Sequence, residues 1–194
     1  MKQQRVLLQG GRIIDMARRI DRIADVLVVD GGVVAMGTEA RTAEHDAVHD
    51  VTGCVVLPAF IDLCASLREG EKQHGTIATE TKAAAKAGFA HVVLPPNAKL
   101  VIDNPALVAQ IKEKAMKAGY ATVYPLGALT KGLAGQQPAN MHALNKAGCL
   151  AVTNVRQSMA NDETLLRCLE YAASLNLTVF FYPEEPLSVL PEMD

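Results

Sequence analysis

Histidine and cysteine are the residue types of this sequence best suited to bind a metal ion, because imidazole and thiolate are good zinc ligands. The chain contains five histidines and four cysteines. They are His45, His49, His74, His91 and His142, with Cys54, Cys64, Cys149 and Cys168. The cysteines form no CxxC pair, so neither a zinc ribbon nor a disulfide framework is indicated. We expect reduced thiols, three of them packed in strands or helices, and surface or packing roles for the histidines.

Charge and hydropathy exclude several classes of function. The chain of 194 residues has 19 basic and 21 acidic side chains, which are spread along its length. The sequence has no basic stripe for nucleic acid, and no apolar run reaches the roughly 18 residues of a membrane span. The first residues lack the apolar core of a signal peptide. We therefore predict a cytoplasmic protein that binds neither nucleic acid nor membranes.

Residues 1–52 have the pattern of short strands joined by tight turns. The expected strands cover residues 5–9, 12–15, 24–29, 33–36 and 48–51. The glycine pair 10–11 predicts one turn, and Asp30-Gly31-Gly32 is a strong hairpin signal. This region is predicted to be a small antiparallel, β-sandwich-like module.

Residues 53–194 alternate apolar runs with helical stretches. Helices are expected near residues 76–87, 105–118, 138–147 and 162–175, with starts at Asn104-Pro105 and Asn161-Asp162. Five apolar runs flank them, which favours a parallel sheet covered by helices. We predict an α/β fold that contains the first five βα units of a TIM-like (β/α)8 barrel. A doubly wound sheet is the alternative, although no G-x-G-x-x-G motif supports nucleotide binding.

Four segments in this order resemble the dihydroorotases, which are cyclic amidohydrolases. Gly53-Cys-Val-Val-Leu-Pro-Ala-Phe-Ile-Asp-Leu-Cys-Ala-Ser-Leu-Arg-Glu69 is similar to their first barrel strand, which reads Leu-Pro-Gly-x-Ile-Asp, His-x-His, Leu-Arg-Glu. Residues 24–37 resemble their N-terminal β module, residues 87–98 their second strand with Met-Pro-Asn-Thr, and residues 125–132 the end of their third. The resemblance implies the first half of such a protein.

The resemblance also implies a zinc-bound hydroxide as the nucleophile, because zinc lowers the pKa of bound water to about 7. The positions of the family's His-x-His pair hold Cys64 and Ser66 here. The family's carboxylate ligand on the fourth strand corresponds to Asn154, and its histidine on the fifth to Tyr182. We therefore expect no zinc cofactor, no catalytic residue and no hydrolase activity from this chain alone.

Two substrate-binding positions match the family. Arg68 corresponds to the arginine that pairs with the substrate carboxylate, and Asn97 to the asparagine that assists it. Arginine suits that task because its planar guanidinium can meet a carboxylate with two hydrogen bonds. The alternative is an ion pair between Arg68 and a nearby acid such as Glu69 or Glu71.

Three functional hypotheses follow. The first is a non-catalytic member of the family that acts in pyrimidine biosynthesis as a scaffold for the aspartate carbamoyltransferase catalytic chain. The second is an active zinc amidohydrolase with unusual ligands, such as Cys64 and Tyr182, completed by further strands. The third is an unrelated α/β binding protein. Because five strands leave two open edges, we expect either a piece of a longer chain or an oligomer.

Overall fold

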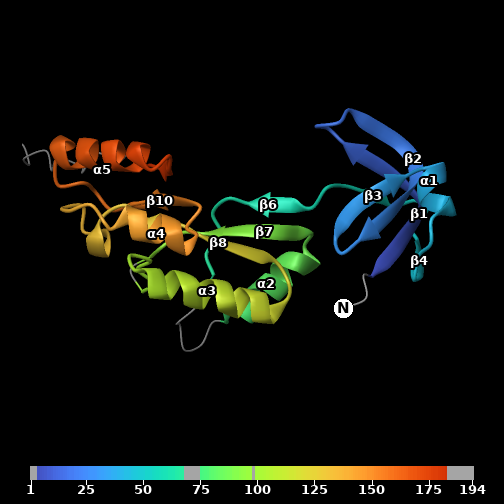
Figure 1. The fold of residues 1–194 in the computed structure, drawn as a ribbon, viewed down its shortest axis with the longest axis horizontal. Coiled ribbons are helices and arrows are strands. Elements are labelled where there is room, and N and C mark those ends of the chain that lie inside the picture. The colour runs from blue at the N-terminus through green and yellow to red at the C-terminus, as the bar shows by residue number, and fades with distance from the viewer. Residues whose placement is uncertain (1–3, 68–74, 98, 183–194) are drawn as a thin grey trace, which may run out of the picture. The chain divides into compact units, whose positions relative to one another are not determined.

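The computed structural model describes residues 4–67, 75–97 and 99–182 and contains two compact units (Figure 1). The first unit is Met1–Pro58 and the second is Ala59–Asp194. The division lies further along the chain than the expected boundary between residues 52 and 53. The reason is the short strand β5 (Val55–Val56), which pairs with the first strand of the first unit and therefore belongs to it.

The first unit is a mixed β sheet with one short helix. Its other elements are β1 (Arg5–Asp15), β2 (Ile20–Val29), β3 (Gly32–Met36), α1 (Thr38–Thr42) and β4 (Ala47–Asp50). The sheet order is β3-β2-β1-β4, and β5 also pairs with β1. β1, β2 and β3 are antiparallel as predicted, but β4 and β5 run parallel to β1. An all-antiparallel module was therefore the wrong prediction, because the chain passes through α1 before it returns to β1.

The two glycine signals of this unit have different outcomes. Asp30 and Gly31 have φ angles of 49° and 81° and form the predicted hairpin turn between β2 and β3. The turn predicted at the glycine pair 10–11 is wrong, because β1 continues through it with a register shift. Gly10 has φ 78°, and a Cβ there would lie 2.6 Å from Thr52 Oγ1. Glycine at this position thus allows a β-bulge with a positive φ angle and leaves room for the side chain of Thr52.

The described residues of the second unit form five parallel barrel strands, one of which bends. Its strands are β6 (Phe60–Asp62), β7 (Phe89–Leu94), β8 (Thr122–Pro125), β9 (Gly127–Ala128), β10 (Ala151–Thr153) and β11 (Thr178–Phe180). They form the sheets β6-β7-β8 and β9-β10-β11, in which every pairing is parallel. Only Leu126 separates β8 from β9, so these two form one strand that pairs with β7 and then with β10.

Two backbone hydrogen bonds mark this bend. The Leu126 N–H donates to Leu94 O at 2.8 Å, and the Leu150 N–H donates to Pro125 O at 3.2 Å. The five strands therefore follow one another in sequence order, as they do in a (β/α)8 barrel. The partial barrel is confirmed, and the doubly wound alternative is wrong because the strand order never reverses.

The predicted helices are confirmed, except that the one expected from residue 138 starts at Met141, and capping groups mark several of their starts and ends. They are α2 (Ile77–Lys86), α3 (Pro105–Ala118), α4 (Met141–Ala147) and α5 (Asp162–Ser174), with a 3-10 turn η1 (Lys131–Leu133). The Oδ1 atom of Asn104 accepts the N–H of Leu107, which caps α3. Gly119 ends α3 and Gly148 ends α4 in the left-handed conformation that glycine adopts at little steric cost.

Alternate residues of the strands pack on opposite faces of the sheet. Val92, Leu94 and Val123 pack with the helices in the main hydrophobic cluster. Val93, Leu126 and Ala151 form a second cluster. Since successive side chains of a strand face opposite sides, this second cluster belongs to the inner, barrel face. This packed inner cluster therefore supports the carboxyl ends of the strands.

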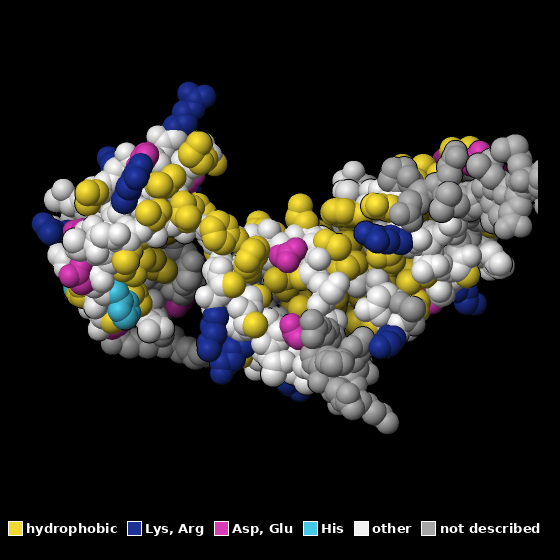
Figure 2. Space-filling view, turned by 180° about the vertical axis from the view of Figure 1, so that it is seen from behind, with side chains coloured by type: hydrophobic (Ala, Val, Ile, Leu, Met, Phe, Trp, Pro, Cys, Tyr) yellow, Lys and Arg dark blue, Asp and Glu magenta, His cyan; other side chains and the backbone are white. Residues whose placement is uncertain are grey.

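The edges of the partial barrel carry exposed apolar side chains. Among the described strands, β6 pairs only with β7 and β11 only with β10. Phe60, Ile61 and Phe180 are 49%, 58% and 36% exposed. Figure 2 shows hydrophobic side chains gathered over the second unit on the face turned to the viewer. Within the described ranges, no helix has the length and apolar content needed to cross a membrane.

Candidate functional site

The carboxyl ends of β6, β7, β10 and β11 and the bend between β8 and β9 surround a cavity of about 330 Å³. We call it the strand-end cavity. Its lining includes Cys64, Pro95, Leu126, Thr153, Arg156, Phe180 and Tyr182. These residues follow or end β6, β7, β8, β10 and β11. In barrel enzymes the loops at this end of the strands carry the chemistry, so this cavity is the candidate site.

Of the two positions that correspond to the family's His-x-His pair, only one lines the cavity. Cys64 is exposed and lines the strand-end cavity, and its N–H donates to Asp62 Oδ1 at 2.9 Å. Ser66 is also exposed but is absent from the described lining of the cavity. The two positions therefore do not present a chelating pair to the cavity.

Asn154 is turned away from the cavity into a buried hydrogen-bond network. Its side chain is 1% exposed, its Oδ1 accepts the Thr130 hydroxyl at 2.5 Å, and its Nδ2 donates to Gln157 O at 3.0 Å. The Thr130 hydroxyl oxygen accepts the Gly135 N–H at 2.9 Å. Thr153, the last residue of β10, lines the cavity, whereas Asn154 follows the strand and is absent from the described lining. The Asn154 side chain thus connects the loop after β9, through Thr130, with the loop after β10, through Gln157.

Tyr182 and Arg156 both line the cavity and contact each other. The guanidinium carbon of Arg156 lies 5.1 Å from the centroid of the Tyr182 ring, within the range of a cation–π contact. Arg156 was not among the residues predicted from the sequence to lie in the site. The available signal was its position two residues after Asn154, in the loop that follows β10, because such loops line the sites of barrels.

Of the two predicted substrate-binding residues, Asn97 is within the described part of the chain and Arg68 is not. Asn97 lies in the loop after β7, where its Oδ1 accepts the N–H groups of Lys99 and Leu100, both at 2.8 Å. Its acceptor atom therefore orders its own loop, and its Nδ2 is the group that could donate to a carboxylate. Arg68 lies outside the described residues, as do Glu69 and Glu71.

The donor groups of this site do not fit a zinc centre. Zinc sites in proteins use several thiolate, imidazole or carboxylate ligands, whereas the matched positions here offer a thiol, a hydroxyl, an amide and a phenol. In the part of the chain that the structure describes, no three histidine, cysteine, aspartate or glutamate side chains gather closely enough to share a metal ion.

None of the four histidines that the structure describes contributes to the lining of the strand-end cavity. His91 lies within β7 and its Nδ1 is 3.4 Å from the Tyr124 hydroxyl, which gives it a packing role on the sheet. The His45 ring forms a hydrogen bond with Ala43 O, while His49 lies on β4 and His142 on α4. His74 lies outside the described residues.

The cysteines divide into two exposed and two buried thiols. Cys54 and Cys64 are exposed, and Cys149 and Cys168 are buried. Burial raises the pKa of the Cys149 thiol to about 11 and also raises the pKa of Cys168. The expectation of three packed thiols was therefore too high by one, because Cys54, which was expected to lie in an apolar strand, is exposed and directly precedes the short strand β5.

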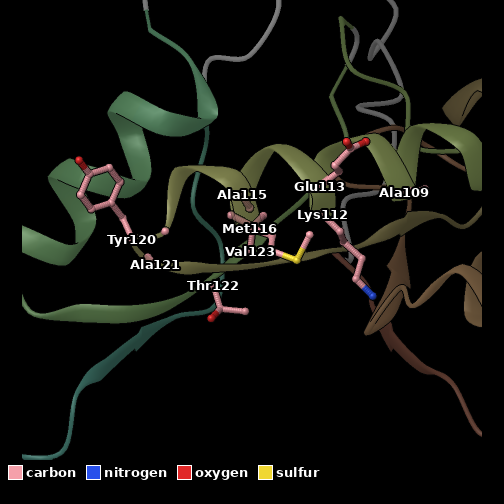
Figure 3. A pocket seen from close by; sticks show the side chains of 10 residues that line it. Ala109, Lys112, Glu113, Ala115, Met116, Tyr120, Ala121, Thr122 and Val123 are labelled. Atoms are coloured by element: carbon pink, nitrogen blue, oxygen red, sulfur yellow. The ribbon is translucent and has the colours of Figure 1, made fainter. Parts of the chain in front are cut away.

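A larger cavity, of about 590 Å³, lies beside α3 and β8 (Figure 3). Met116, Tyr120 and Val123 contribute to a mainly apolar lining. Its carboxylate, Glu113, pairs with Lys117 at 2.6 Å, and this hydrogen bond lowers the pKa of Glu113. Because this cavity lies on a helix and offers no set of converging polar groups, the strand-end cavity remains the better candidate despite its smaller volume.

Residues 53–186 match the dihydro-orotase-like protein family. The chain belongs to that family. It is 39% identical over 182 residues to a dihydroorotase from Syntrophotalea carbinolica, covering 93% of this chain and 43% of the relative. It is 38% identical over 181 residues to a dihydroorotase-like protein from Pseudomonas aeruginosa, with the same coverage. The chain thus spans less than half the length of these relatives, and the hypothesis of an unrelated α/β protein is wrong.

Solved structures with the same fold include hydantoinases and a dihydroorotase. An L-hydantoinase from Arthrobacter aurescens superposes with a TM-score of 0.73 at 16% identity, covering 93% of this chain and 41% of that one. A dihydroorotase superposes with a TM-score of 0.66 at 13% identity, covering 93% of this chain and 52% of that one. At these identities the likeness shows the fold, and the partial coverage agrees with a partial barrel.

Proposed function

We propose that this dihydroorotase-like chain acts in pyrimidine biosynthesis without hydrolysing dihydroorotate itself. The observation that carries the proposal is the use of Asn154, at the position of the family's carboxylate ligand, in a buried network with Thr130 and Gln157. A neutral amide committed to two hydrogen bonds inside the protein supplies no charge to a metal. Without a metal, a water molecule keeps a pKa far above neutral and is a poor nucleophile at pH 7.

A second candidate function is an active cyclic amidohydrolase with unusual ligands. It is favoured by one observation, which is that Cys64 and Tyr182 line the same cavity. A thiolate and a phenolate could both bind a divalent ion, and further strands would have to complete the site. The first proposal is preferred because Ser66 and Asn154 add no ligand to this pair.

The measurement that separates the two is zinc content together with turnover. The chain is incubated with excess zinc, freed of unbound metal, and assayed for bound zinc and for dihydroorotate hydrolysis. We expect substoichiometric zinc and no turnover above the buffer rate, because one thiol and one phenol cannot replace the family's ligand set. One zinc per chain with measurable hydrolysis would refute the proposal.

We further infer that the chain is a scaffold for the aspartate carbamoyltransferase catalytic chain in the cytoplasm. The free thiols suit a reducing compartment. The exposed side chains of Phe60, Ile61 and Phe180 on the outer strands are the surface that an associated protein would cover. Such unpaired apolar edges favour association.

Sedimentation of a mixture tests this partnership. With the carbamoyltransferase chain of the same organism, we expect one faster-sedimenting species that contains both proteins. Ile61→Lys should weaken the complex, because it places a charge on the open edge of β6. The control Met116→Lys changes a residue of α3 that is 76% exposed and should leave the complex unchanged. Independent sedimentation of the two proteins, with this chain as a monomer, would contradict the inference.

A further inference from the structure

The first unit contains a polar cavity of about 560 Å³ beside residues 22–25 of β2. We call it the β2-edge cavity. It forms because β3 pairs with β2 only at residues 26–29, after which the chain leaves the sheet at Gly37 and starts α1. Gly37 has φ 74°, which allows this turn, and its N–H donates to Asp25 O at 2.8 Å. Among the described residues, no strand therefore covers this side of β2 at residues 22–25.

Two arginines line the β2-edge cavity, and a buried carboxylate holds one of them. Asp25 is 8% exposed, and its Oδ1 accepts the Gly10 N–H at 2.9 Å. Its Oδ2 pairs with Nε of Arg41 at 3.0 Å, so the two terminal nitrogens of that guanidinium remain as donors. Asp25 is the one carboxylate among the described residues that line the cavity. It therefore fixes the position of Arg41 and neutralises one of the two positive charges.

Arg22 supplies the second charge, and no carboxylate in the described part of the chain pairs with it. Its Nη2 lies 3.6 Å from Sδ of Met36, a weak acceptor that positions the guanidinium without neutralising it. The preceding residue, Asp21, pairs with Arg12 at 2.7 Å, and successive side chains of a strand face opposite sides. The cavity thus combines one uncompensated positive charge with the N–H donors of two guanidinium groups.

We propose that the β2-edge cavity binds a phosphate monoester, held between Arg22 and Arg41. A guanidinium meets phosphate oxygens with two parallel hydrogen bonds, and a monoester offers three terminal oxygens that two arginines can share. A carboxylate offers only two. The cavity is larger than a phosphate group, so the organic part of the ester lies against the exposed side chain of Ile23. The site belongs to the first unit, and the proposal does not depend on whether the barrel strands hold a metal.

Amide NMR spectra of the nitrogen-15-labelled chain locate the site directly. The chain is titrated with phenyl phosphate at constant ionic strength and pH 8, where a monoester carries close to two negative charges. We expect saturable shifts of the amide signals of Ile23 and Gly37, which line the cavity. The amide of Gly127, in the second unit, is the internal reference and should not shift. Inorganic phosphate should shift the same signals at higher concentration, because it lacks the ring.

Two arginine variants test the role of the charge. Arg22→Met should weaken the binding of phenyl phosphate by roughly 10-fold or more, the effect of losing a charge-assisted hydrogen bond. The matched variant Arg12→Met removes an exposed arginine of the same sheet that pairs with Asp21. It should leave the affinity almost unchanged, because salt screens exposed charges. Both substitutions are at exposed positions, and the dispersion of the amide signals verifies that the variants fold.

The proposal is overturned if phenyl phosphate gives no saturable shift at Ile23 and Gly37, or if benzoate, a ring with a carboxylate, binds as tightly. Equal weakening by Arg12→Met and Arg22→Met would also overturn it, because a diffuse positive charge would then explain the binding. None of these outcomes involves zinc content or dihydroorotate hydrolysis, so a failure of this proposal is distinct from a failure of the proposed function.

Discussion

Asn154→Asp is expected to lower the free energy of unfolding at pH 7 by about 2–4 kcal/mol, the range for a buried polar group that loses its partners or gains an uncompensated charge. The substitution restores the carboxylate that the family resemblance implies at this position. In this structure, however, the side chain is 1% exposed and its Nδ2 donates to Gln157 O. A carboxylate cannot donate there, and its charge would face a carbonyl oxygen. Chemical denaturation at constant pH measures the effect.

The loss should depend on pH in a defined direction. Burial raises the pKa of a carboxyl group above the ~3.9 of an unfolded aspartate, because it disfavours the charged form. The folded variant therefore holds its proton at pH values where the unfolded chain has lost it. Its stability approaches that of the parent below about pH 4 and falls as the pH rises, by up to ~1.4 kcal/mol per pH unit. A deficit that stays constant with pH would contradict burial of the new charge.

Asn140→Asp is the matched control. Asn140 is exposed at the start of α4, where its Oδ1 accepts the N–H of Ala143 at 3.1 Å. Aspartate caps a helix about as well as asparagine does, so we expect a change within about 0.5 kcal/mol. If Asn154→Asp were equally neutral, or gained one bound zinc per chain, the side chain would face the cavity and the proposed function would lose its main support.

Local chemistry made much of the second unit predictable. Asn104 followed by a proline predicted the start of α3, and Gly119 its end, because each satisfies backbone groups within a few residues. The same reasoning predicted the hairpin at Asp30 and Gly31. Such signals need no knowledge of the rest of the molecule, which explains why the helices agree with the prediction closely.

The features that could not be predicted depend on contacts between distant segments. The parallel pairing of β4 and β5 with β1 follows from the path of the chain after α1, which no short motif encodes. The site shows the same limit. Cys64 and Tyr182 were singled out as positions in a family pattern, but their shared cavity, and the contact of Tyr182 with Arg156, depend on the curvature of the sheet.

Gly135→Ala is expected to lower the free energy of unfolding by about 3 kcal/mol or more, because it combines backbone strain with a steric clash. Gly135 has φ 72°, and a Cβ there would overlap Ser158 O and lie 3.1 Å from Met159 Cα. The Gly135 carbonyl also accepts the Ala160 N–H at 2.9 Å. These are backbone neighbours that cannot rotate away, so the loop after β9 would have to separate from the loop after β10.

Gly132→Ala separates the two causes. Gly132 has φ 64°, close to that of Gly135, but a Cβ there would meet nothing within 4 Å. The control should therefore lose only the ~1 kcal/mol of left-handed strain. Urea denaturation of the two variants measures the difference, and equal losses would contradict the close approach of the loops. Since Gly135 N–H donates to Thr130 Oγ1, which in turn donates to Asn154, the clash also disturbs the network that holds Asn154 away from the cavity. Gly135 thus helps to keep Asn154 in its buried hydrogen-bond network.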